Sequence, residues 1–245
     1  MEEKHSPLAQ FAIDRLAHFQ VGGFDVSFTN SSLFMVIAIA LVAALMILGI
    51  GGGRMIPGRV QSVAELCYEF VANMLRENVG DEGKPYFPFI FSLFMFILFS
   101  NLLGMVPYSF TVTSHIVVTL ALALVVFIGV TIIGFVRHGA HFLRFFVPAG
   151  VPAPLLVLLV PIEVLSYFIR PVSLSVRLFA NMLAGHTMLK VFAGFVVALG
   201  VLGGWAPLAF VIALTGLEIL IACLQAYVFA ILSCLYLNDA IHMHH

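Results

Sequence analysis

Long apolar stretches with almost no charge in them dominate this sequence. A helix needs about 20 predominantly apolar residues to cross the hydrocarbon core of a bilayer. Of the 245 residues, 62% are hydrophobic and only 9% are charged, whereas a soluble domain carries about 25% charged residues. Because so few charges cannot cover a soluble surface, the sequence predicts an all-α polytopic membrane protein and excludes the soluble enzyme folds.

Five apolar segments predict membrane-crossing helices, and one amphipathic segment predicts a helix on the membrane surface. In the amphipathic segment, Val63, Leu66, Phe70, Met74 and Leu75 recur at spacings of three and four residues, opposite its charged side chains. We expect a single membrane domain, 1–245, ordered as an N-terminal arm (1–30), the first crossing (33–53), the surface helix (59–79), the second crossing (86–106), the third crossing (115–137), a long helix with Arg177 (152–199) and a final helix with Glu218 (206–238).

The last two apolar segments are longer than a perpendicular crossing requires. Such segments must tilt, bend or lie partly along the interface. Pro161 and Pro171 are places where the first of them could bend. We therefore expect a long tilted helical hairpin whose turn contains Gly203, Gly204 and Trp205.

The basic residues predict the orientation of the chain, because short cytoplasmic loops are enriched in Lys and Arg. The connections at 107–114 and 200–206 carry no basic residue. The N-terminus is therefore expected outside and the C-terminus inside. The basic residues of the other two connections are Arg54, Arg59, Arg76 and Lys84 in one, and Arg137 and Arg144 in the next.

Charged residues inside the last two apolar segments are candidates for function. A charge at the bilayer centre costs about 3 kcal/mol or more, so it is rarely present without a role. At about 100° per residue, several polar side chains of the long helix fall within roughly 40° of Arg177 and form one polar stripe. The stripe contains Glu163, Ser166, Arg170, Ser173, Arg177 and Asn181, and the remaining charges are Lys190 and Glu218.

Two further residues suggest proton exchange. His186 projects to the side of the long helix opposite Arg177, while Glu218 and Gln225 lie about 20° apart on one face of the final helix. Imidazole titrates near neutrality and a desolvated carboxyl moves toward it, so protons could pass between His186 and Glu218. Arg177 cannot join such a relay, because a guanidinium does not give up its proton under physiological conditions, and it would act as a fixed positive charge.

Each of these residues also has a structural interpretation. Arg177 and Glu218 could form a buried ion pair between helices. Arg170 and Lys190 could extend along the helix to reach the interface. His186 could be a packed side chain held by a hydrogen bond.

Other chemistry finds little support in the sequence. The C-terminal side chains of His242, Met243, His244 and His245 could bind a soft metal ion, but with no further ligands nearby we favour a solvated tail. We expect no metal and no cofactor. The chain has no phosphate-binding loop of the G-x-x-x-x-G-K-[ST] kind, and no basic patch large enough for nucleic acid.

Four polar or small residues within helices are expected to serve packing. Cys67, Cys223 and Cys234 are interpreted as small packing residues, since the last two are too far apart along a helix to form a disulfide. Asn101, inside the second crossing, is expected to hydrogen-bond to a neighbouring helix.

Four motifs resemble one family of membrane subunits. PVSLSVRLFANMLAGH begins at Pro171, LEILIACLQAYVFAILSCLYL begins at Leu217, FSNLLGMVPYSF ends the second crossing, and PGRVQSVAELCYEF lies in the amphipathic segment. These motifs, and their order along the chain, resemble those of subunit a of the F-type ATP synthases, over roughly residues 30–240. The resemblance leaves only the N-terminal arm uninterpreted.

The resemblance implies a stator in the membrane sector. Such a subunit contacts a ring of hairpin subunits, the c-ring, each with a proton-carrying carboxylate, and offers it two offset aqueous half-channels through which protons flow and turn the ring. The implied partners are the c-ring, peripheral-stalk b-type subunits, membrane lipid and protons, with no nucleic acid. The implied location is the bacterial inner membrane, and any ATP chemistry belongs to other subunits.

The resemblance also implies roles for individual residues. Arg177 matches the arginine that faces the ring carboxylate and blocks a direct proton leak, and Asn181 and Gln225 match the polar residues beside it. His186 and Glu218 match the pair of the entry half-channel, in the exchanged order found in mitochondrial forms and their alphaproteobacterial relatives. Glu163 matches an acidic residue on the exit side, and Ser173 is a minor channel-lining group.

Two other functions remain as alternatives. A self-contained transporter or channel would line its own polar path with the stripe, although the internal repeat common in transporters is missing. A structural anchor would use the buried charges only for assembly. Protons are favoured over sodium as the transported ion, because a sodium site needs several oxygen ligands.

Overall fold

The computed structural model describes residues 13–17, 20–21, 24–25, 27–50, 58–106, 109–147 and 152–242. Within these ranges, five helices are long and apolar enough to cross a membrane, and the amphipathic helix α2 is not one of them. The predicted fold class, a polytopic helical membrane protein, is confirmed. The helices are α1 (Asn30–Ile50), α2 (Arg59–Val79), η3 (Asp81–Tyr86), α3 (Phe87–Gly104), η4 (Val112–Ser114), α4 (Ile116–His138), η5 (Gly139–Phe146), α5 (Ala153–Gly203) and α6 (Trp205–Ile241).

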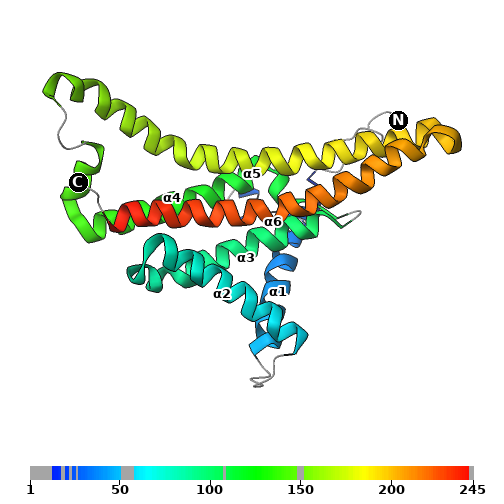
Figure 1. Ribbon diagram of the computed structural model, residues 1–245, viewed down its shortest axis with the longest axis horizontal. Coiled ribbons are helices and arrows are strands. Elements are labelled where there is room, and N and C mark those ends of the chain that lie inside the picture. The colour runs from blue at the N-terminus through cyan, green and yellow to red at the C-terminus, as the bar shows by residue number, and fades with distance from the viewer. Residues whose placement is uncertain are drawn as a thin grey trace.

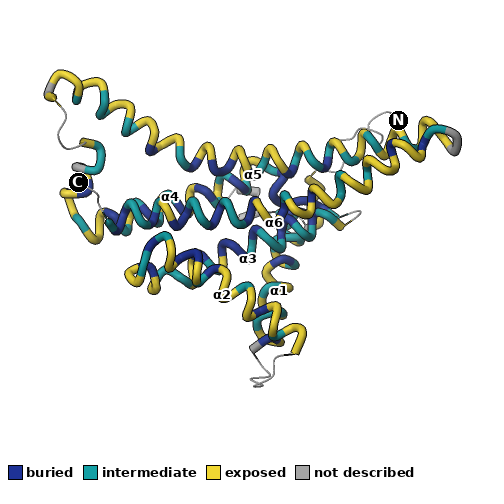
Figure 2. Tube along the Cα trace, in the orientation of Figure 1, coloured by how far each residue is buried: buried dark blue, intermediate teal, exposed yellow. Residues whose placement is uncertain are grey.

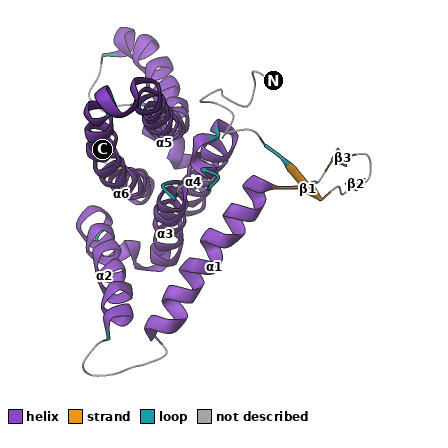
Figure 3. Ribbon diagram, turned by 90° about the vertical axis from the view of Figure 1, so that its right-hand side faces the viewer, coloured by secondary structure: helices purple, strands orange, loops and turns teal. Residues whose placement is uncertain are grey.

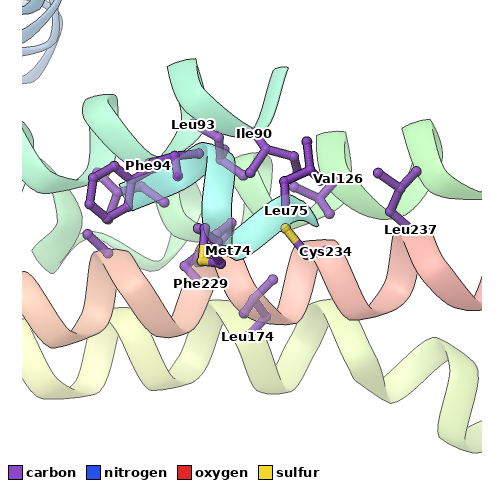
Figure 4. Close-up of a cluster of buried hydrophobic side chains, with 14 of the residues drawn as sticks. Met74, Leu75, Ile90, Leu93, Phe94, Val126, Leu174, Phe229, Cys234 and Leu237 are labelled. Carbon is purple, nitrogen blue, oxygen red and sulfur yellow. The ribbon is translucent and has the colours of Figure 1, made fainter. Parts of the chain in front are cut away.

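Helix α6 is the central element of the fold. It contacts α2, α3, α4 and α5, while α5 packs on α6 and α4, and α1 packs on α2 and α3. Figures 1 and 3 show that α5 and α6 run side by side along the length of the molecule, whereas α1 runs across their direction. The hydrophobic core lies where α2, α3 and α4 meet α6, and Figure 4 shows its side chains, including Leu93, Phe94, Phe229 and Leu237.

The hairpin of α5 and α6 is longer than the membrane is thick. The apolar span Pro154–Gly200 of α5 has 47 residues, which at 1.5 Å per residue reach about 70 Å, against a hydrocarbon core of about 30 Å. Helices of this length exceed a perpendicular crossing, as the sequence predicts, and fit within the hydrocarbon core only if they are strongly tilted. Figure 2 shows exposed residues along the outer side of this hairpin.

The break in the long apolar segment falls at a glycine and not at the prolines. Helix α5 runs through Pro161 and Pro171 and is gently curved (Figure 1), and within it only Gly200 has a non-helical backbone, with φ 58° and ψ −157°. Proline removes one backbone hydrogen bond and bends a helix, but the positive φ of Gly200 turns the chain out of the helix. The turn therefore begins before Gly203, and the Gly204 amide donates to the Gly200 carbonyl at 2.8 Å.

The predicted apolar face of α2 is only partly buried. Met74 and Leu75 lie in the core, but Val63, Leu66 and Phe70 are exposed. The face of α2 that points inward is rotated relative to the predicted one, because small side chains let α2 approach α1. A Cβ added at Gly49 would meet Cβ of Ala64 at 2.6 Å. The exposed apolar residues of α2 are left for lipid or for other proteins.

The described part of the N-terminal arm forms short strands. Strand β1 (Arg15–Ala17) pairs antiparallel with β4 (Phe28–Thr29), and β2 (Gln20–Val21) pairs with β3 (Phe24–Asp25). The arm therefore leads directly into α1 at Asn30, whose backbone amide donates to the Asp14 carbonyl at 3.1 Å.

Candidate functional site

A histidine and a carboxylate meet between the two long helices. His186 on α5 and Glu218 on α6 are both buried, and Nδ1 of the imidazole is hydrogen-bonded to Oε1 of the carboxyl. The other ring nitrogen, Nε2, lies 3.0 Å from the carbonyl oxygen of Gly104 at the end of α3. The imidazole thus links three helices, and Glu218 is not paired with Arg177 as the structural alternative supposed.

The partners of His186 limit its protonation. The Gly104 carbonyl can only accept, so Nε2 is assigned a hydrogen that it donates. Nδ1 then faces a carboxyl oxygen, and this contact needs one proton, carried by the nitrogen or by the oxygen. Removing that proton leaves a lone pair facing an anion, so one of the two hydrogen bonds must break. The pair is therefore built to hold one exchangeable proton.

Gly185 makes room for the carboxyl of Glu218. A Cβ built at Gly185 would lie 2.7 Å from Oε1 and 3.0 Å from Cδ of Glu218. Any side chain at this position would displace the carboxyl from His186. The sequence analysis missed this residue, because a glycine before a candidate histidine carries no signal until the opposite helix is placed.

Arg177 lies on the outer face of α5. It is exposed, as are Ser173 and Asn181 one turn to either side, and within the described residues Arg177 forms no ion pair. Two of their neighbours on this face, Val172 and Val176, are 50% and 43% exposed. The guanidinium therefore stands in an apolar surface of the chain and not in its core.

The other polar residues lie at different depths along α5. Glu163, 14 residues before Arg177, is half-buried, and Ser166 is exposed. At 1.5 Å per residue, Glu163 lies about 21 Å from Arg177 along the helix, and His186 about 13 Å from it in the opposite direction. Gln225 is buried on α6, seven residues beyond Glu218, and Lys190 is exposed.

Arg170 pairs with α6 and does not extend to the interface as the structural alternative supposed. Its guanidinium lies 2.9 Å from Oδ2 of Asp239. It also lies over three aromatic rings, those of Phe145, Tyr167 and Tyr236, at 5.6, 5.4 and 5.0 Å from their centroids. Arg170 therefore leaves the polar stripe around Arg177, and Asp239 is a partner that the sequence analysis missed.

Asn101 makes the predicted bond between helices. Its side-chain amide donates to the carbonyl oxygen of Ala222 on α6 at 3.1 Å and accepts from the hydroxyl of Thr113 at 2.7 Å. Both polar side chains are fully buried. This pair fixes η4 and α3 against α6 one turn away from Glu218.

The opposite end of α6 is held by charged groups of the connecting segments. Arg137 at the end of α4 pairs with Glu82 of η3, and Nε2 of His138 lies 3.2 Å from the Ile241 carbonyl oxygen. His242 lies 3.8 Å from Glu82. The candidate metal-binding residues Met243, His244 and His245 lie outside the described residues, within which no group of three or more possible ligands gathers.

The cysteines occupy three different environments. Cys234 is buried in the core and Cys67 is half-buried on α2, where burial raises the pKa of its thiol. Cys223 is exposed on α6, so its interpretation as a packing residue is wrong for the isolated chain. All three are free thiols.

Comparison with known proteins identifies the family. The chain matches the ATP synthase A chain family over residues 32–238. It is 58% identical over 241 residues to ATP synthase subunit a of Pelagibacter ubique (strain HTCC1062), covering 98% of this chain and 99% of that protein. It is 61% identical over 240 residues to ATP synthase subunit a of Rhodospirillum rubrum, covering 98% and 100% of the two chains. With the long α5–α6 hairpin, the exposed arginine and the buried histidine–glutamate pair, these matches show that the chain belongs to the ATP synthase A chain family.

Proposed function

We propose that this chain is the stator subunit of a bacterial F-type ATP synthase, which forms two proton half-channels and couples proton flow to rotation of the c-ring. Membership of the ATP synthase A chain family supports the complex in which the chain works. The relatives named ATP synthase subunit a match it over almost their full length. The remaining steps rest on the arrangement of the polar groups.

The observation that carries the proposal is the exposure of Arg177 within an apolar helix. Its helix contains an apolar segment, Pro154–Gly200, that is long enough to span a membrane. A guanidinium facing lipid at that depth would cost about 3 kcal/mol or more. A partner that places a carboxylate against this face removes the cost, and the c-ring is proposed as that partner.

The groups on either side of Arg177 can carry the two proton routes. The His186–Glu218 pair holds one exchangeable proton, and Glu163 lies on the other side of Arg177 along α5. Arg177 keeps its charge at every physiological pH, so it repels protons and prevents a direct passage between the routes. We assign His186 and Glu218 to the outer half-channel and Glu163 to the inner one, with Ser173, Asn181 and Gln225 as lining groups.

The surroundings of the subunit follow from the same assignment. The outer face of α5 contacts the c-ring, and the exposed apolar residues of α1 and α2 contact lipid and b-type subunits of the peripheral stalk. The basic residues of the connections, among them Arg76 and Arg137, favour a C-terminus in the cytoplasm and an N-terminus outside the plasma membrane.

Replacing Arg177 tests the proposal. In inverted membrane vesicles, Arg177→Ala is expected to abolish ATP-driven proton pumping, while the c-ring still co-purifies with the complex. Lys190→Ala is the matched control, because Lys190 is also an exposed cation on α5 and has no assigned role. Pumping at the wild-type rate by Arg177→Ala would overturn the proposal.

A second measurement separates the stator from a self-contained transporter. The purified chain in liposomes is expected to conduct no protons, because its half-channels do not meet without the ring. Proton conduction by the chain alone would favour the transporter.

A further inference from the structure

Three buried polar atoms in the described part of the chain have no hydrogen-bonding partner. They are Oγ of Ser100 on α3, Nε2 of His115 at the start of α4 and Oε2 of Glu218 on α6. Buried polar groups are almost always bonded to protein or to ordered water, and a polar cavity as small as one water molecule is enough to supply such a partner. Water is therefore the partner expected for these three atoms.

The elements that carry these atoms meet at one place. Ser100 lies one turn before Gly104, whose carbonyl binds His186, and next to Asn101, which binds α6 at Ala222. Ala222 lies one turn beyond Glu218. Ser100 and Glu218 therefore belong to the same junction of α3, α5 and α6.

The connection between α3 and α4 brings His115 to the same junction. A Cβ built at Gly104 would lie 2.8 Å from the hydroxyl oxygen of Thr111, so this side chain rests against the residue that binds His186. The hydroxyl of Ser114 donates to the Thr111 carbonyl at 2.6 Å, and η4 packs against α5. His115 follows directly, with its ring stacked on that of Phe110 at 5.0 Å.

This junction is lined with hydroxyl groups, although it lies in an apolar chain. Thr111, Thr113 and Ser114 are all at most 3% exposed, and Ser100 is 1% exposed. A hydroxyl both donates and accepts, so hydroxyls and waters in series can pass a proton along. His115 is the only residue between 105 and 119 whose side chain titrates near neutral pH.

From this arrangement we infer that residues 109–115, which lead into α4, form the hydrated mouth of the outer half-channel and that His115 is its outermost proton-carrying group. The inference rests on the proposed function and adds a residue and an entrance to it. A proton passes between His115 and the His186–Glu218 pair through the waters and hydroxyls around Ser100 and Thr111. Burial lowers the pKa of His115, so its imidazole is neutral at rest and accepts a proton only in passing.

Substitution of His115 tests the relay. His115→Ala and His115→Gln are each expected to lower the initial rate of ATP-driven proton pumping at least threefold in the assembled complex, because neither side chain carries a proton. His141→Ala is the matched control, since His141 is exposed in η5 on another connection. Wild-type pumping by His115→Gln would overturn the relay role, and so would wild-type pumping by His115→Ala.

Access of water to position 100 tests the hydrated mouth independently of His115. This test can be made even if the His115 variants assemble poorly. Ser100→Cys and Ser233→Cys are made in a background in which the three native cysteines are alanine. Both serines are buried, but the Ser233 hydroxyl is bonded to the Phe229 carbonyl at 2.8 Å. Ag⁺ added to the outer face of right-side-out vesicles is expected to inhibit ATP synthesis at least fivefold more in Ser100→Cys than in Ser233→Cys. Equal inhibition of the two would overturn the hydrated mouth.

The outcomes separate this inference from the proposed function. If Arg177→Ala abolishes pumping while the His115 and Ser100 variants behave as their controls, the stator remains and the mouth lies elsewhere. If Arg177→Ala pumps normally, the proposed function itself fails.

Discussion

The substitution Gly185→Ala adds a single methyl group and is expected to lower the rate of proton pumping. The new Cβ would lie 2.7 Å from Oε1 of Glu218, whereas ordinary contacts begin at 3.4 Å, so the carboxyl must retreat by 0.7 Å or more. Overpacking of this kind costs about 1–3 kcal/mol. The retreat also pulls Oε1 away from His186, and both costs fall on the carboxyl that accepts the proton in the proposed function.

The expected effect is at least a fivefold loss of proton pumping, since 1 kcal/mol corresponds to about fivefold in rate. The assay is the initial rate of ATP-driven acidification of inverted vesicles, normalised to the amount of assembled complex. Gly194→Ala on the same helix is the control, because nothing lies within 4 Å of a Cβ at that position.

A second substitution makes the test sharper. Glu218→Asp shortens the carboxyl side chain by one methylene, which opens the space that the new methyl needs. The double variant Gly185→Ala, Glu218→Asp is therefore expected to pump faster than Gly185→Ala alone. The reasoning is refuted if Gly185→Ala pumps as fast as Gly194→Ala, or if shortening Glu218 brings no recovery.

Four further predictions concern the polar groups. Glu218→Gln should lower pumping at least 100-fold, in line with the typical loss of about 10²–10⁴-fold for a proton-transfer group, and retention of more than about a hundredth of the rate would contradict it. Asn101→Ala should destabilise the chain by about 1 kcal/mol, because it removes two buried hydrogen bonds, which thermal unfolding in detergent can measure. Asp239→Asn should cost only about 0.5 kcal/mol, because the side chains of its ion pair with Arg170 are 25% and 38% exposed, and a loss above about 2 kcal/mol would show that the pair matters more. Since the pKa of His115 is lowered in the fold, the unfolded chain binds the extra proton, so stability should fall as the pH drops below about 6.5, and His115→Gln should show a shallower fall between pH 7.5 and 5.5.

The sequence predicts the helices well, because their signal is local. Apolar runs of 20 or more residues identify the spans without any knowledge of their neighbours. The face of α2 was harder to predict, since Val63 and Leu66 are as apolar as the residues that reach the core. Which of them is buried depends on the close approach of Ala64 to Gly49, and this contact lies between helices.

Hairpin symmetry explains which charged residues meet. In an antiparallel pair of helices, residues equally distant from the turn lie at the same level. His186 and Glu218 are centred on residue 202, within the turn from Gly200 to Gly204. The sequence analysis placed both residues as candidates but did not use this symmetry.

The same symmetry would have found Asp239. Residues 170 and 239 are centred between residues 204 and 205, so the partner of Arg170 follows once the turn is known. The roles of Gly185 and of the Gly104 carbonyl do not follow from the position of the turn. Their roles arise from three helices meeting, and no pattern within one segment reports this.

The outer face of α5 has a mechanical consequence. Apart from Arg177 and its small polar neighbours, this face offers aliphatic side chains such as Ile169, Val172 and Val176, exposed by 49%, 50% and 43%. Contacts between such groups have no preferred direction, whereas hydrogen bonds must be broken and remade at each step of a sliding surface. In the proposed function the outer face of α5 therefore slides along the c-ring with little resistance. Added amide groups, as in Val176→Gln, would slow the rotation of the ring while leaving the proton route intact.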